Sequence, residues 1–435
     1  MVKGTRDRAD DPQADAAVPA PEAARPADRG PAVARAMESC ARALEGWVAF
    51  SRRKLRAGEL GSLPVVLVLA VVWITFQSLN SNFLSPRNLS NLSVDIVGTG
   101  LIAVGIVFVL LLGELDLSVG SISGLAAAVF AVLNVNNGVP EWLALIVAVL
   151  AGTAAGTVQG YSFARTRVPA FVVTLAGLLT WNGLMLYILG TSGTINLDES
   201  GLVADLTSYY FTNDAVAYGL AALSVGLVFL VSYQDRRRRT AAGMPHRSLQ
   251  IIVVRTGGLA VIAFVTAYLL NRFQGLPLAL LIFLVVVAGL DVILRRTHYG
   301  RQVYALGGGI EAARRASLRV TRVQTAVLAV SGTMAAVGGL FLASRITSVS
   351  QSSGSGVLLL NAIAAAVIGG TSLFGGRGST WSAVLGMLVI QSIASGMAIT
   401  DTPAAVQFMI TGGVLFAAVV IDALSRRSQE AHGRA

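Results

Sequence analysis

The chain has 435 residues, of which 54% are hydrophobic and only 13% are charged, and its mean hydropathy is +0.69. Soluble domains carry about 25% charged residues, so this composition excludes an ordinary soluble protein and indicates a membrane protein. The net charge of +10 comes largely from arginines between apolar blocks, a placement that is typical of membrane topology rather than of nucleic-acid binding.

Residues 1–60 are predicted to form a disordered, basic, cytoplasmic N-terminal tail, because their Ala, Pro, Asp and Arg cannot bury a core. A signal peptide is not expected, because these residues contain no apolar stretch near the start. Cys40, the single cysteine, excludes an internal disulfide and a cysteine-rich metal site. The basic run SRRKLR at 51–56 precedes the first apolar block and is expected to hold the N-terminus in the cytoplasm.

Twelve apolar segments follow along the chain. Their lengths are close to the roughly 20 residues that a membrane-spanning helix needs. They predict an all-α transmembrane bundle of about 10–12 spans over residues 61–425 and a cytoplasmic C-terminal tail over 426–435. The basic patches and the acidic loop at 190–214 then fall on opposite sides of a cell (inner) membrane, with both termini cytoplasmic. The segments are 61–79, 96–112, 120–133, 142–163, 169–189, 215–233, 251–270, 276–294, 323–343, 357–374, 381–399 and 404–423.

The apolar run from Ile96 to Leu133 contains two carboxylates in the sequence LLLGELDLSVGS. As one helix this run would be about 57 Å long, whereas a hydrocarbon core is about 30 Å thick. A broken helix is therefore expected near 113–120. The acidic residues Glu114 and Asp116, with Ser118, either cap the following helix in contact with water or line a gate in a translocation path.

Glycines at four-residue spacing, Gly152, Gly156 and Gly160, are predicted to let two helices pack closely; a sliding surface for gating is the alternative. Other polar residues in the spans, Thr174, Trp181, Asn182, Asn361 and Gln391, are candidates for the path. A tryptophan ring can stack on a sugar and an amide can bind its hydroxyls, but interface anchoring and helix packing are the more common roles of such residues.

The cytoplasmic segment 295–322 contains seven arginines and a short helix-forming stretch. Its residues are predicted to form a glycine hinge and a small helix that docks into a partner. The alternative is that this basic loop only sets the orientation of the spans in the membrane. The residues concerned are Gly307, Gly308, Gly309, Glu311, Ala312, Ala313 and Arg314.

No catalytic motif is present in the sequence. It has no phosphate-binding G-x-x-x-x-G-K-[ST] loop, and GGTSLFGGRGS at 369–379 is interpreted as a turn between spans. The three histidines lie in loops or in the tail. We therefore expect a transport subunit that is not an enzyme, with no metal site and no cofactor of its own.

Four motifs carry a resemblance to a known family. GELDLSVGSISGLAAAV, VPAFVVTLAGLLTWNGLMLYI, GRQVYALGGGIEAARRASLRV and LNAIAAAVIGGTSLFGGRGS resemble, in the same order, segments of the ribose/xylose-type permeases of ATP-binding-cassette (ABC) importers, and most of all the D-xylose branch. The likeness covers about residues 60–425. In the third motif, Gly309 replaces an asparagine and Arg315 a leucine of the family pattern.

The resemblance implies a type II ABC importer permease fold and a coupling role for 295–322. It also implies a separate ATPase subunit that uses ATP and magnesium, an extracytoplasmic sugar-binding protein, and a second permease copy in a homodimer. The expected cargo is a monosaccharide such as xylose, carried across the lipid without any nucleic-acid partner. The alternatives are an ion-coupled secondary transporter, a passive channel or structural membrane protein, and an ABC permease for a branched-chain amino acid or nucleoside.

Overall fold

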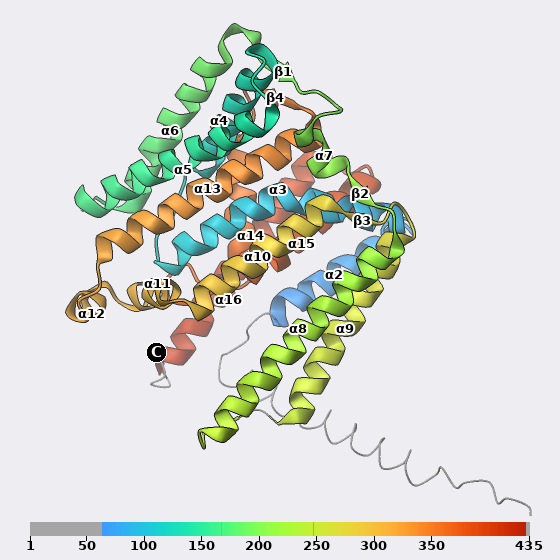
Figure 1. Ribbon diagram of the computed structural model, residues 1–435, viewed down its shortest axis with the longest axis vertical. Coiled ribbons are helices and arrows are strands. Elements are labelled where there is room, and N and C mark those ends of the chain that lie inside the picture. The colour runs from blue at the N-terminus through green and yellow to red at the C-terminus, as the bar shows by residue number, and fades with distance from the viewer. Residues whose placement is uncertain (1–62, 167, 247, 432–435) are drawn as a thin grey trace, which may run out of the picture. The chain divides into compact units, whose positions relative to one another are not determined.

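The computed structural model describes residues 63–166, 168–246 and 248–431, and these are almost entirely helical (Figure 1). The predicted N-terminal tail 1–60 lies outside the described residues. Nine of the described helices are long and apolar enough to cross a membrane, and α2, α14 and α16 contain shorter apolar stretches. The predicted polytopic helical bundle is confirmed.

Each of the twelve predicted segments overlaps one helix. These helices are α2 (Leu63–Leu79), α3 (Pro86–Leu111), α4 (Val119–Ala131), α5 (Glu141–Thr166), α6 (Ala170–Leu189), α8 (Asp214–Ala241), α9 (Leu249–Asn271), α10 (Leu278–Arg296), α13 (Val320–Ile346), α14 (Gly356–Ile368), α15 (Thr380–Ile399) and α16 (Ala404–Ala431). The last helix therefore continues into the predicted C-terminal tail.

Short elements join the long helices. A π-helix, η1 (Val132–Asn136), extends α4, and a 3-10 turn, η2 (Gly190–Ser192), follows α6. Two antiparallel strand pairs, which the all-α prediction did not include, tie together loops that are distant in sequence. The remaining elements are α7 (Leu202–Ser208), α11 (His298–Gly308), α12 (Ile310–Arg315), and the pairs β1 (Thr194–Asn196) with β4 (Ser348–Ser350) and β2 (Tyr210–Phe211) with β3 (Leu276–Pro277).

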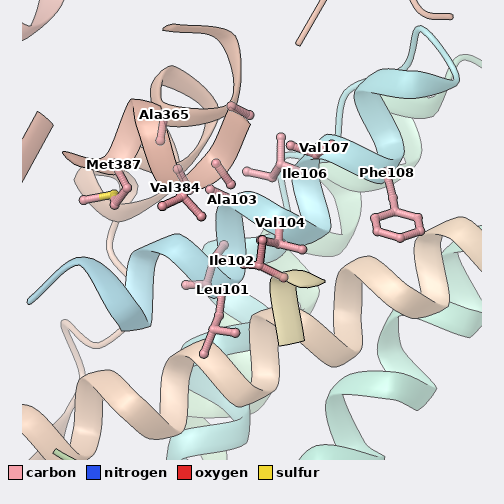
Figure 2. Packing of buried hydrophobic residues seen from close by; sticks show 14 of the residues in the cluster. Leu101, Ile102, Ala103, Val104, Ile106, Val107, Phe108, Ala365, Val384 and Met387 are labelled. Carbon is pink, nitrogen blue, oxygen red and sulfur yellow. The ribbon is translucent and has the colours of Figure 1, made fainter. Parts of the chain in front are cut away.

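Helix α3 forms the centre of the apolar core. It begins at Pro86, ten residues before the predicted start at 96, because the Ser85 side chain accepts a hydrogen bond from the Asn88 N–H and caps it. From Ile96 onward its residues are buried. Figure 2 shows side chains of α3 packed against residues of α14 and α15.

Helices α5 and α13 cross at very close range, as the glycine spacing predicts. A Cβ on Gly156 would overlap the carbonyl oxygen of Leu328, and one on Gly152 would lie 2.9 Å from the carbonyl of Gly332. Thr153 and Thr333 share a hydrogen bond of 2.8 Å across the same contact. Small residues allow backbones this close, and interhelical hydroxyl bonds add to the packing.

Helix α14 is shorter than the predicted span 357–374, because it ends at Ile368. The preceding loop reaches inward, and the carbonyl of Gly354 lies 2.8 Å from the position of a Cβ on Gly120. Turn hydrogen bonds from Ser353 and Ser355 to the residues three before them satisfy part of this loop's backbone. Irregular backbone is tolerated at such a depth only where protein surrounds it.

Candidate functional site

The run from Ile96 to Leu133 is broken between Leu111, the last residue of α3, and Val119, the first residue of α4. Gly113 adopts a positive φ of 79°, and its N–H bonds back to the last turn of α3 at 2.8 Å. The predicted break is thus present, and we call residues 112–118 the break segment.

Asp116 lies inside the bundle, with only 1% of its surface exposed. Its Oδ1 accepts from the N–H of Ser118 at 3.0 Å and from the Ser118 hydroxyl at 2.6 Å, and its Oδ2 accepts from the Ser331 hydroxyl at 2.8 Å. Ser331 is in the middle of α13. It lies roughly 17 Å along the helix axis from the first residue, Val320, at a rise of 1.5 Å per residue. Protein donors therefore replace the water that the sequence interpretation expected around this carboxylate.

Ser118 occupies the position before α4, where a capping role was predicted. Its side chain makes no capping hydrogen bond to α4. Its hydroxyl faces Asp116 instead, and it also lies 2.8 Å from Oε1 of Gln159 on α5. The serine therefore joins the break segment to α5 rather than stabilising the start of α4.

The start of α6 lies against the same segment. The N–H of Ala170, the first residue of α6, donates to the half-buried carboxylate of Glu114. Thr174, one turn further, donates its hydroxyl to the carbonyl of Leu115 at 3.2 Å. A carboxylate at a helix N-terminus is favoured by the helix dipole, so Glu114 helps to hold α6 on the break segment.

Two residues of this polar group were not predicted. Gln159 is a buried glutamine in α5 and Ser331 a buried serine in α13. The signal for Gln159 was a lone amide inside a span of otherwise small and apolar residues, next to Gly160 of the glycine series.

The predicted path residues do not all gather at one place. Trp181 is half-buried on α6 and packs beside the apolar core. Its ring nitrogen and the Gln159 amide both lie next to Gly177. Asn182, the next residue, is exposed, and Asn361 is half-buried on α14. Neither asparagine takes part in the hydrogen bonds described above for the break segment.

The predicted coupling loop forms two short helices, α11 and α12. Gly307 and Gly308 are the last residues of α11, so they are helical rather than flexible, and only Gly309 separates the two helices. In α12, Ala313 is buried whereas Glu311 and Arg314 are exposed and pair at 3.2 Å. The exposed pair contributes little stability and leaves a charged surface available to a partner.

Helix α11 lies beside the end of α3 (Figure 1), and it also contacts the turn 369–379. A Cβ on Gly307 would overlap the carbonyl of Leu111, and the same carbonyl accepts from the N–H of Gly376 at 2.9 Å. Tyr304 donates its hydroxyl to the carbonyl of Gly378 at 2.9 Å. Helix α11 of the predicted coupling loop therefore lies one contact away from the break segment.

Two tyrosines of α11 have perturbed acidities. Burial raises the pKa of Tyr299, and it also raises the pKa of Tyr304, where the Arg295 charge lowers the pKa in part. The Tyr304 hydroxyl is used in its hydrogen bond to Gly378, whereas the Tyr299 hydroxyl has no hydrogen-bond partner within the described residues.

The part of the chain that the structure describes contains no cluster of metal-ligating side chains. There, no three His, Cys, Asp or Glu residues come close enough together to hold a metal ion. A polar cavity of about 500 Å³ lies away from the break segment, at the end of α9, where Asn271 and Gly275 line it.

A multi-span helical bundle, broken at a buried carboxylate and carrying short exposed helices beside the break, defines a membrane transport subunit. The chain belongs to the branched-chain amino acid transport system/permease component family, whose model matches residues 88–419. In this family the chain is a permease subunit and not an enzyme, and the ATPase is a separate subunit.

The relatives include sugar permeases. The chain is 37% identical over 365 residues to the xylose transport system permease protein XylH of Escherichia coli (strain K12), covering 83% of this chain and 90% of that protein. It is 28% identical to the ribose import permease protein RbsC of Bacillus subtilis (84% and 94%) and 29% identical to the L-arabinose ABC transporter permease protein AraH of Azospirillum brasilense (84% and 89%). No solved structure matches the chain.

Proposed function

We propose that this chain is the membrane-spanning permease subunit of an ABC importer for a pentose, with xylose as the first candidate. One observation carries the choice of sugar: identity to the xylose permease is 37%, whereas identity to the ribose and arabinose permeases is 28–29%. The matched region includes the break segment and the coupling helices, which are the parts that a transport cycle would use.

Helix α12 is the proposed docking element for the ATPase subunit. Its Glu311 and Arg314 are exposed, while Ala313 anchors the helix on the bundle. Through Gly307 and the carbonyl of Leu111, a displacement of α11 would reach the end of α3 directly. The ATP and magnesium would be used by that partner, so this chain needs no cofactor.

The break segment is the proposed gate. Glu114, Asp116, Ser118 and Thr174 join α3, α4, α6 and α13 at one point, so that their hydrogen bonds set how these helices sit relative to one another. Asp116 is too buried to touch a sugar in this conformation and would act by holding the segment.

Trp181, Asn182 and Asn361 remain the candidates for weak contacts with the sugar. An importer that takes its specificity from a binding protein needs only loose contacts along its path, because tight binding would slow release. None of the three lies in the cavity at the end of α9.

The proposed assembly contains two copies of this chain, two ATPase subunits and an extracytoplasmic sugar-binding protein. Both termini would be cytoplasmic, because the arginine-rich ends of α8 and α10 and the coupling helices then share one side. The loop that carries Asp198, Asp205 and Asp214 would face the binding protein on the other side.

Uptake of radiolabelled xylose, with and without the gene for this chain, tests the proposal. Gene-dependent xylose uptake that persists with an ionophore and stops when ATP is depleted is the expected result. Ionophore-sensitive uptake would indicate an ion-coupled transporter instead. Gene-dependent uptake of leucine or a nucleoside, without xylose uptake, would contradict the choice of a sugar.

A further inference from the structure

Two N–H donors near the break segment have no hydrogen-bond partner within the described residues. They are Nε2 of Gln159 on α5 and Nε1 of Trp181 on α6. Gln159 is 3% exposed. An unpaired donor at such a site costs about 1–3 kcal/mol, so the two donors require an explanation.

The two donors point into the same small space. The side chains of Gln159 and Trp181 both approach the position that a Cβ on Gly177 would occupy, with Trp181 Nε1 at 3.1 Å from it. A side chain at Gly177 would overlap the Gln159 amide. The absence of a side chain there leaves room for the amide and the indole to meet.

The oxygen of the Gln159 amide faces another oxygen, that of the Ser118 hydroxyl. Gln159 Oε1 lies 2.8 Å from Ser118 Oγ, which is also 2.6 Å from Asp116 Oδ1. A hydroxyl has one hydrogen and can donate to only one of these acceptors. The carboxylate is the stronger acceptor, so the Gln159 oxygen is left facing a lone pair of the serine.

A half-turn of the Gln159 amide removes both problems, because it exchanges positions of nearly identical shape. We infer that Gln159 points its Oε1 at the Trp181 N–H and its Nε2 at Ser118, and that it is the residue that positions Trp181 relative to Asp116. The resulting chain of donors runs from Trp181 to Gln159, from Gln159 to Ser118, and from Ser118 to Asp116.

This series of hydrogen bonds connects four elements of the buried bundle. Trp181 belongs to α6, Gln159 to α5, Asp116 to the break segment, and Ser331 on α13 completes it through Oδ2 of Asp116. Bonds in a buried network strengthen one another. A change at the break segment would therefore alter the placement of the Trp181 ring, which connects the proposed gate to a candidate path residue.

The test is the indole N–H signal of Trp181 in the full-length, ¹⁵N-tryptophan-labelled protein in lipid nanodiscs, assigned with Trp181→Phe. Gln159→Leu removes the acceptor, and we expect the Trp181 signal to move upfield. Gln159→Glu keeps acceptor oxygens and should leave the signal hydrogen-bonded. A Trp181 signal in Gln159→Glu that matches the upfield signal of Gln159→Leu would show that the side chain at 159 does not accept from the indole, and would overturn the inference.

Ser392→Ala provides a matched control. Trp73 Nε1 donates to Ser392 Oγ at 2.9 Å, so this variant should move the Trp73 signal and leave that of Trp181 in place. If Gln159→Leu leaves the Trp181 signal unmoved while Ser392→Ala moves that of Trp73, the inference is wrong. Since the measurement concerns bonds within the resting chain, its failure would not affect the proposed sugar transport.

Discussion

Gly307, at the C-terminal end of α11, lies so close to the carbonyl oxygen of Leu111, the last residue of α3, that a side chain on Gly307 would overlap it. The carbonyl of Leu111 also accepts a hydrogen bond from Gly376. Three segments that are distant in sequence therefore meet next to the start of the break segment, and α11 contacts the residue that precedes it.

Gly307→Ala should disturb this contact. The added methyl group must displace backbone, which costs about 1–3 kcal/mol, so we expect a lower apparent melting temperature and reduced uptake. Gly308→Ala is the matched control, because nothing lies within 4 Å of the added Cβ and alanine favours a helix by about 1 kcal/mol. Equal melting temperatures and uptake in the two variants would contradict the close contact.

Glu311→Arg should impair coupling without unfolding the chain. Glu311 is exposed, and we expect uptake to fall by about tenfold, as a loss of about 1.4 kcal/mol in docking would cause. Asp235→Arg makes the same charge reversal at another exposed carboxylate that pairs with an arginine, Arg239 on α8, and should keep normal uptake. Deletion of residues 307–315 would be a poorer test, because Gly307 and Ala313 are packed in the bundle. Wild-type uptake by a well-expressed Glu311→Arg variant would remove the coupling role.

Asp116→Ala should destabilise the break segment. It leaves the N–H and hydroxyl of Ser118 and the hydroxyl of Ser331 without their acceptor, at about 1–3 kcal/mol for each group. Asp116→Asn retains one acceptor oxygen and should unfold at a temperature between those of wild type and Asp116→Ala. The comparison requires thermal unfolding in detergent alongside uptake. A fully active and stable Asp116→Ala would argue against both the structural and the gating role.

Tyr304→Phe and Tyr299→Phe should behave differently, although both remove a buried hydroxyl from α11. The first loses the 2.9 Å hydrogen bond to Gly378, worth about 0.5–1.5 kcal/mol. The second removes a hydroxyl with no partner among the described residues and should be neutral or slightly stabilising. Melting temperatures of the two purified variants decide this, and a larger loss in Tyr299→Phe would be the contrary result.

Gly156→Ala should weaken the crossing of α5 and α13, because its Cβ would overlap the carbonyl of Leu328. We expect a cost of about 1–3 kcal/mol, seen as less folded protein on size-exclusion chromatography. Gly183→Ala on α6, where nothing lies within 4 Å of the added Cβ, should leave the folded fraction unchanged or slightly higher. A normal profile for Gly156→Ala would mean that the two helices can move apart freely.

Errors in the predicted helix limits arose where local chemistry outweighed hydropathy. The first ten residues of α3 are mostly polar, yet Ser85 and Pro86 begin the helix there. The segment 357–374 was read as one span, but α14 ends at Ile368, and Gly370 adopts a positive φ of 101°. The pair Gly369 and Gly370 favours a helix end at this point, because glycine adopts a positive φ without strain.

The polar site could be predicted only in part, for a different reason. Glu114, Asp116 and Ser118 are adjacent in the chain, and their charge inside an apolar run marked them. Ser331 lies 215 residues from Asp116, and no local pattern indicates that the two would meet. Gln159 was missed because a single amide in a span is more often packing than function.

The order of residues was sufficient to predict the membrane class, the succession of apolar segments, the placement of charge and a break near 113–120. These properties follow from the transfer of individual residues between water and lipid, which needs no knowledge of their neighbours. The tertiary structure alone decided that Asp116 is enclosed by donors from α13 and the break segment, that Gly307 presses on Leu111, and that Gln159 lies between Ser118 and Trp181. Those contacts join residues far apart in the chain, and only the packing of whole helices brings them together.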